Sequence, residues 1–206
     1  FVVTKLYLPP RDFLTDTVAW PVLIFVTAWV CWRVRGPGLA VFSGGAVAII
    51  GLIGMWELSI DTLVQILIST ALALIVAIPL GVLAGRNRHV NALLSPILDA
   101  LQTIPSLVYI IPAVILFTVG IVPGIIATVL YAMVPGVRIT ALGIREVAPE
   151  SIEASRTFGA TPRQTLFGVR IPLAAPTIMA GINQVIMMVI AMVIITGLVG
   201  GGALGF

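Results

Sequence analysis

Long apolar runs constrain this chain more than any other feature. Several of them approach the roughly 20 residues that an α-helix needs to cross about 30 Å of hydrocarbon, and short polar or glycine-rich turns separate them. Inside a lipid core every backbone polar group needs an internal partner, and a helix supplies one by itself. Charged residues make up 9% of the chain, whereas a soluble domain carries about 25%. The sequence therefore predicts an all-α polytopic membrane protein.

We expect about six transmembrane helices in this chain. Arginines cluster in the turns near residues 33–35 and 86–89 and in the passage 138–170, and basic turns of this kind stay on the cytoplasmic side. The glycine-rich residues 197–205 would form an outer turn before a further span that this sequence lacks. The predicted spans cover residues 17–32, 39–56, 62–85, 93–119, 125–136 and 173–197.

A few residues within or beside the spans carry specific expectations. Gly81 and Gly85 would let another helix approach closely, although small residues are tolerated in any span. Asp99 should pair with an arginine from a neighbouring loop, since an unpaired carboxylate in a span is costly. Pro9 and Pro10 are expected to prevent residues 1–16 from forming a helix.

The one markedly polar passage, residues 138–172, holds five of the eleven basic and three of the eight acidic residues. Pro149 suits the first position of a helix, and Gly159 suits a left-handed stop after it. Thr161 and Gln164, three residues apart, predict a capping box that starts a second short helix. So small a loop would bury Phe158 and Ile152 poorly by itself, which indicates that a partner could cover them.

The same passage resembles the EAA loop of ABC importer permeases. Glu153-Ala154-Ser155 is followed after three residues by Gly159 and, nine residues later, by the run 169–172, Val-Arg-Ile-Pro. The family pattern is E-A-A, three residues, G, nine residues, I-x-L-P. The spacing agrees throughout. The departures from the family pattern are Ser155 in place of alanine and two aliphatic exchanges in the run 169–172.

The resemblance covers residues 61–206 and implies a type I ABC importer permease fold in a prokaryotic inner membrane, with a cytoplasmic coupling helix. The runs 98–120, 123–144 and 172–194 are similar to those of permeases for glycine betaine, proline betaine and choline-type osmolytes. Residues 1–60 would then carry two extra helices ahead of a permease core at 61–206, with the coupling loop at about 138–172.

This resemblance also implies partners. A second permease copy, two ATPase subunits on the cytoplasmic side and an extracytoplasmic substrate-binding protein would complete the transporter in the lipid bilayer. The coupling positions carried over are Glu150, Glu153, Ala154, Ser155, Arg156, Phe158 and Gly159. Gly159 could equally be a simple helix cap and Glu153 a partner of the helix dipole, and both roles can hold together.

The residues also exclude some chemistry. Lys5 is the only lysine, so the chain has no GxxxxGK[ST] phosphate loop and cannot hydrolyse ATP by itself. His89 is the only histidine, which excludes an HExxH metal site. No basic patch suits nucleic acid. We therefore expect a transport subunit without enzymatic activity, metal or cofactor, with ATP and Mg²⁺ on the partner ATPase.

The transport pathway and its cargo are less constrained. Polar or flexible side chains in the spans could line a passage, although ordinary packing explains such residues too. An amino acid such as methionine, or another small organic ion, is an alternative cargo. An ion-coupled secondary transporter is the alternative mechanism, although it would need ionisable or unwound sites near the midplane. The candidate lining residues are Gln102, Tyr109, Asn183, Gln184 and Met187.

Overall fold

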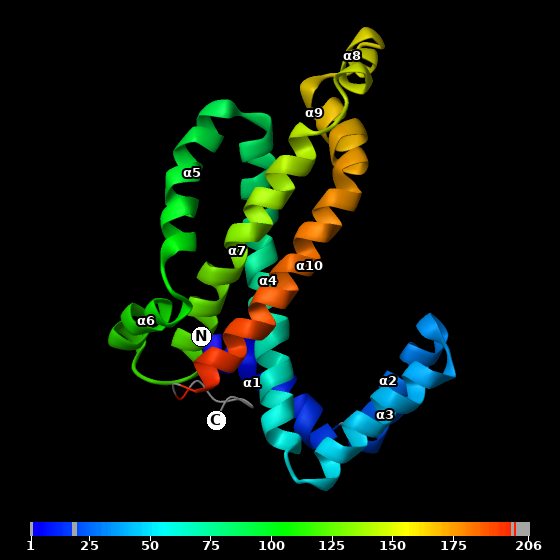
Figure 1. Cartoon of the computed structure of the whole chain (residues 1–206), viewed down its shortest axis with the longest axis vertical. Helices are drawn as coiled ribbons and strands as arrows, with labels where there is room; N and C mark the ends of the chain where they lie inside the picture. The colour runs from blue at the N-terminus through cyan, green and yellow to red at the C-terminus, as the bar shows by residue number, and fades with distance from the viewer. Residues whose placement is uncertain (1, 18–19, 199, 201–206) are drawn as a thin grey trace.

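The computed structural model describes residues 2–17, 20–198 and 200, and every regular element in this part of the chain is helical. Three long helices, α4 (Trp56–Arg86), α7 (Ile121–Arg145) and α10 (Ile171–Gly197), run side by side through the molecule (Figure 1). The other elements, in chain order, are η1 (Val2–Tyr7), α1 (Leu8–Asp12), η2 (Phe13–Thr17), α2 (Trp20–Arg35), α3 (Pro37–Leu52), α5 (Arg88–Thr103), η3 (Ser106–Tyr109), α6 (Ile110–Phe117), α8 (Pro149–Thr157), α9 (Pro162–Thr165) and η4 (Leu166–Arg170).

In the described residues, helices account for most of each of the six predicted spans, and these helices differ in length. Helices α4, α7 and the continuous stretch Pro162–Gly197 are long and apolar enough to cross a membrane. Two bent pairs, Lys5–Thr15 with Trp20–Arg35 and Arg88–Thr103 with Ser106–Phe117, raise the number to five if each pair is one span. The remaining apolar helix, α3, has 16 residues, about 24 Å of rise. The α2–α3 hairpin leans away from the three long helices (Figure 1).

Glycines bring α4 and α7 into backbone contact. A Cβ atom added at Gly81 would lie 2.5 Å from the Cβ of Thr140, and one added at Gly85 would lie 2.6 Å from the Cβ of Ile144. Both distances are too short for real side chains, so the two helices approach as closely as glycine allows. The close approach predicted from these two glycines is confirmed.

Helix α10 joins this pair by the same means. A Cβ atom at Gly136 of α7 would lie 2.6 Å from a methyl group of Val185, and one at Gly143 would lie 2.9 Å from the Cβ of Thr177. The buried cluster between the three helices consists of small and β-branched residues: Ala73, Ala132, Val185, Val189 and Val193. Without a hydrophobic driving force between lipid-bathed helices, such close packing is the main source of association.

The predicted fourth span, residues 93–119, is not one straight helix. Helix α5 ends at Thr103, and the following helical pair is bent away from it by 109°. Pro105 explains the break, because a proline drives the preceding residue out of the helical region. Ile104 accordingly has the extended angles φ −73° and ψ 126°. The structure therefore corrects the expected single span to a broken one.

The predicted fifth span was too short. Helix α7 runs from Ile121 to Arg145, whereas the sequence suggested an end near residue 136 because Arg138 follows. The guanidinium of Arg138 donates to the carboxylate of Asp99 on α5. Arg138 therefore lies inside α7 with its charge paired to a neighbouring helix, and it does not mark the end of α7. The expected partner for Asp99 is confirmed, although it lies on a helix and not in a loop.

The N-terminal expectation was wrong. Residues 2–17 are helical throughout, and Pro9 and Pro10 lie in α1, which they do not break. Both prolines lie in the first turn of α1, directly after η1, where a backbone N–H group has no α-helical partner. The Tyr7 hydroxyl donates to Asp61 at 2.9 Å, and the Nε of Arg11 donates to the same oxygen at 2.6 Å. This N-terminal segment is therefore fastened to the start of α4.

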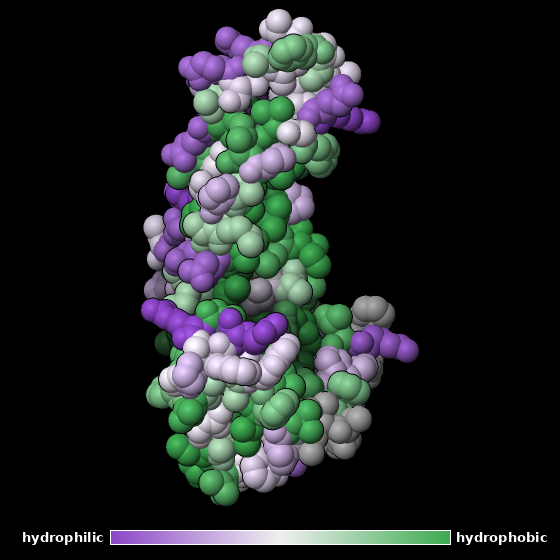
Figure 2. All heavy atoms as spheres, turned by 90° about the vertical axis from the view of Figure 1, so that its right-hand side faces the viewer, coloured by the Kyte–Doolittle hydropathy of each residue, from purple (hydrophilic) through white to green (hydrophobic). Residues whose placement is uncertain are grey.

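The sixth span begins earlier than predicted. Helices α9, η4 and α10 form one apolar stretch of 36 residues from Pro162, so the expected second short helix is the first part of the spanning helix. Figure 2 shows hydrophobic side chains over much of this face, with hydrophilic side chains at the α8–α9 end, along one edge of the upper half and in a band across the middle. The predicted turn at 197–205 and the span after it fall mostly outside the described residues, since 199 and 201–206 are not described.

Candidate functional site

Helix α8 has the termini that its sequence indicates. Pro149 occupies the first turn, where its missing N–H group leaves no hydrogen bond unmade. Gly159, just beyond the helix, has φ +80°, a left-handed conformation that favours glycine. The N–H groups of Gly159 and Ala160 donate to the carbonyls of Arg156 and Ser155 at 2.9 and 3.0 Å. The predicted stop at Gly159 is confirmed.

The return from α8 to the membrane is also fixed locally. The Thr161 N–H donates to the side-chain oxygen of Gln164 at 2.8 Å, and the Gln164 N–H donates to the Thr161 hydroxyl at 3.4 Å. This is the predicted capping box. It begins the 36-residue helix that ends at Gly197. The loop after α8 therefore leads directly into the first turn of a spanning helix.

One face of α8 packs inward. Ile152 is half-buried against the apolar cluster of Ile144, Val147, Ala174 and Ile178. The expectation that a partner would have to cover Ile152 was wrong, because the ends of α7 and α10 and the turn after α7 cover it. The hydroxyls of Ser155 and Thr165 lie 3.1 Å apart, and Thr165 is buried. These contacts hold α8 against the ends of α7 and the α9–α10 helix.

The opposite face of α8 is open. The Phe158 side chain is 91% exposed, and Glu150, Glu153 and Ala154 are exposed as well. A fully exposed aromatic side chain next to carboxylates is typical of an interaction surface, where aromatic anchors provide much of the binding energy. We call the residues Glu150, Glu153, Ala154 and Phe158 the outer face of α8.

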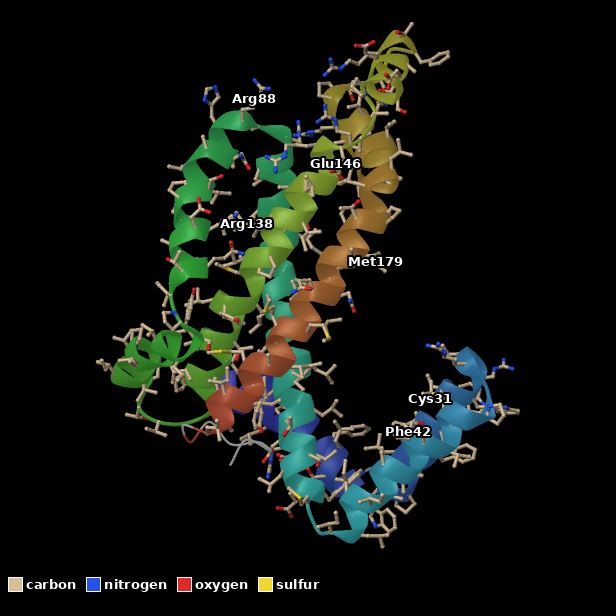
Figure 3. The ribbon with its side chains drawn as sticks, viewed as in Figure 1. Cys31, Phe42, Arg88, Arg138, Glu146 and Met179 are labelled. Atoms are coloured by element: carbon tan, nitrogen blue, oxygen red, sulfur yellow. The ribbon has the colours of Figure 1, made fainter. Side chains whose placement is uncertain are left out.

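The seven predicted coupling residues therefore divide into two groups. Four form the outer face, and Gly159 sets the turn beside it. Ser155 is half-buried and faces Thr165, while Arg156 lines a small cavity with residues of α4 and η4. Figure 3 places Arg88 and Glu146 at the same end of the molecule as α8. The basic turn at 86–89 and the polar loop thus share one end, as expected.

Among the predicted pathway residues, Gln102 lines a cavity of about 190 Å³ beside Tyr131, Pro135 and Met188. Tyr109 does not have an open position: it is 5% exposed, and its hydroxyl donates to the Leu101 carbonyl. Its ring packs edge-on against Tyr131, with centroids 5.8 Å apart. Tyr109 therefore contacts Leu101 and Tyr131, two residues that line the cavity, without lining it itself.

The other three predicted pathway residues lie on α10. Asn183 and Met187, four residues apart, are exposed on one side of the helix, and Gln184 is half-buried. The cavity beside Gln102 is instead reached from α10 by Met188. The structure thus separates Gln102 from Asn183 and Met187.

Sequence reasoning missed most of the packing stripe on α4. Ala73, Ala77, Gly81 and Gly85 recur every four residues, and the first three are buried. The signal was present, because small residues at this interval lie on one helix face. Only its last pair was recognised from the sequence.

Comparison with known proteins shows which family has this helical fold. Residues 77–206 match the family described as binding-protein-dependent transport system inner membrane component. The glycine betaine/proline betaine transport system permease protein ProW of Escherichia coli (strain K12) is 43% identical over 185 residues, which cover 90% of this chain and 52% of that protein. The glycine betaine transport system permease protein OpuAB of Bacillus subtilis (strain 168) is 40% identical over 183 residues, covering 89% and 65%.

The chain thus spans about half the length of the first relative and 65% of the second. Among solved structures, the MetNI methionine ABC transporter in its inward facing conformations aligns with a TM-score of 0.63 and 23% identity. The alignment covers 70% of this chain and 73% of the MetNI chain. At this identity the likeness concerns the fold.

Proposed function

We propose that this chain, which belongs to the family of binding-protein-dependent transport system inner membrane components, is the permease subunit of an ATP-driven importer for glycine betaine- and choline-type compatible solutes. The outer face of α8 carries the ATP-driven part of this proposal, because Phe158 is 91% exposed while the inner face of the same helix is packed. The cargo is supported by the names of two relatives that match about 90% of the chain.

The partners follow from the same reasoning. A cytoplasmic ATPase subunit, which binds ATP and Mg²⁺, receives the outer face of α8 in a groove. A substrate-binding protein delivers the solute on the other side of the membrane, and a second permease copy completes the passage. In this arrangement the chain itself performs no chemistry: it converts the closure of the ATPases into a movement of its spanning helices.

The contacts of α8 suggest how that movement is transmitted. The helix is joined to α7 by a short turn and to the α9–α10 helix by the Ser155–Thr165 contact and the capping box. Glycines hold α7 closely against α4 on one side and against α10 on the other. A push on α8 therefore moves the inner ends of α7 and α10 together, which is the rigid-body type of switching.

For the passage we propose the region beside Gln102, where an amide side chain faces a cavity between α5, α7 and α10. Quaternary ammonium groups bind to aromatic faces by cation–π attraction, and Tyr131 lines the same cavity. The passage would include Asn183, Gln184 and Met187 only if the second permease copy faces α10.

The decisive experiment reconstitutes this chain with its ATPase and binding protein in proteoliposomes. Glycine betaine should stimulate ATP hydrolysis and accumulate inside, choline should act similarly, and methionine should have no effect. ATPase stimulation by methionine but not by glycine betaine would reject the cargo. Accumulation that persists without ATP but requires an ion gradient would reject the mechanism.

A further inference from the structure

Three arginines from three separate elements surround one small cavity at the inner end of the molecule. Arg86 ends α4, Arg156 lies on α8, and Arg170 immediately precedes α10. Together with Pro162, Thr165 and Leu166 they line a cavity of about 150 Å³. The wall is mostly polar, because three guanidinium groups and the hydroxyl of Thr165 line it.

None of these three arginines has an acidic partner in the part of the chain that the structure describes. The ion pairs there involve Arg11 with Asp12 and Asp61, and Arg138 with Asp99. Three like charges around one cavity repel each other, the more so where water is partly excluded. An anion bound between them would remove this repulsion, and guanidinium groups match the oxygens of a phosphate well.

The position of the cavity along the spanning helices indicates where the anion comes from. Arg86 is the first charged residue after the apolar stretch of α4, and Arg170 is the last before that of α10. Arginines at such boundaries extend toward the level of the lipid headgroups. A neighbouring cavity lined by Arg86, Asn87, Arg88 and His89 continues the basic surface around the α4–α5 turn.

We propose that Arg86, Arg156 and Arg170 bind the phosphate of an anionic phospholipid headgroup, which bridges the coupling helix α8 to the ends of α4 and α10. The cavity is smaller than the roughly 300–1,000 Å³ of sites for organic ligands, and it suits a single phosphate group. The proposal requires only that α4 and α10 cross the membrane. It does not depend on which solute is transported.

The direct test is native mass spectrometry of the full chain purified in detergent and titrated with phosphatidylglycerol, phosphatidylcholine or inorganic phosphate. We expect phosphatidylglycerol to bind in preference to the other two. Arg86→Gln, Arg156→Gln or Arg170→Gln should each weaken this binding about fivefold, and the triple variant about a hundredfold, because each cation near an anionic surface contributes about 1 kcal/mol. Added salt should weaken it as well.

Arg163→Gln is the matched control, since Arg163 lies in the same loop on α9 but outside the cavity wall. It should leave binding unchanged, and the triple exchange to lysine should retain most of it, which separates lost charge from misfolding. Equal binding of both lipids, preference for inorganic phosphate, or equal loss in Arg163→Gln would each overturn the proposal. So would unchanged lipid binding in the triple glutamine variant together with weaker association with the ATPase, since the arginines would then face a protein carboxylate.

Discussion

Glycine has opposite tasks in the spanning core and in the coupling loop. At Gly81 and Gly85 an added Cβ would lie within 2.5 to 2.6 Å of a neighbouring Cβ, and neither backbone has an unusual φ. At Gly159 an added Cβ would meet nothing within 4 Å, but φ is +80°. The core uses glycine for the space it leaves, and the loop uses it for the conformation it permits.

Because glycine acts differently in the two regions, substitutions in the core and in the loop should affect different properties. Contacts between α4, α7 and α10 are backbone-close and leave no room for adjustment, so the three helices are suited to act as one body. Helix α8 is held by one packed face and one hydroxyl contact, while Phe158 on its other side is 91% exposed. Changes in the core should alter folding, and changes on the outer face should alter partner binding with the fold intact.

The largest effect is expected for Gly81→Val. The new side chain would overlap the Thr140 side chain and the Val137 carbonyl, which lies 2.8 Å from the added Cβ, so the backbones must separate. We expect a loss of about 3 kcal/mol or more in stability, measured as a lowered unfolding temperature in nanodiscs. Gly45→Val in α3 is the control, because nothing lies within 4 Å of its Cβ. Equal destabilisation by both would contradict the packing role.

Phe158→Ala should have the largest effect on the loop side. Truncation of an exposed aromatic anchor removes about 2 kcal/mol of docking energy, about a thirtyfold weaker association with the ATPase. The unfolding temperature of the isolated chain should not change. Phe117→Ala is a suitable control, because Phe117 is also exposed but lies at the end of α6. Full ATPase affinity in Phe158→Ala would show that the outer face is not the docking surface.

Gly159→Val should have a somewhat smaller effect. A β-branched residue at φ +80° is strained by about 1–2 kcal/mol, and because the surrounding space is open the turn can relax locally. We expect solute uptake to fall about tenfold relative to ATP hydrolysis, with an unchanged unfolding temperature. Gly159→Asn should keep most of the coupling, since asparagine tolerates this conformation. Uptake at the wild-type level in Gly159→Val proteoliposomes would refute the role of the turn.

The local features of the coupling loop could be predicted from the sequence. Pro149, Gly159 and the Thr161–Gln164 pair act within a few residues of themselves, so their signals need no tertiary information. The spans were located for a similar reason, because lipid selects long apolar runs. Their ends were less predictable: the charge of Arg138 suggested a helix end, but its partner Asp99 lies 39 residues away.

The features that depend on distant partners were not predictable. No local pattern indicates that Arg86, Arg156 and Arg170 line one cavity, because their separation along the chain carries no information about which helix ends meet in the fold. Likewise, Tyr109 looked like a candidate lining residue, and its burial follows from the bend at Pro105. The proline was visible in the sequence, but the direction of the bend was not.

The smallest effect is expected where the loop and the core meet. Ser155→Ala removes one side of the contact with Thr165, and Thr165→Val removes the other. Each should lower the stability of the loop by about 1 kcal/mol, and the double variant should cost less than the sum, because the second change removes a partner already lost. Hydrogen exchange of the α8 amides in the two single variants and the double variant measures this difference. Strict additivity would mean that α8 follows the α9–α10 helix through the covalent turn and the packing of Ile152, and that the hydroxyl pair transmits nothing.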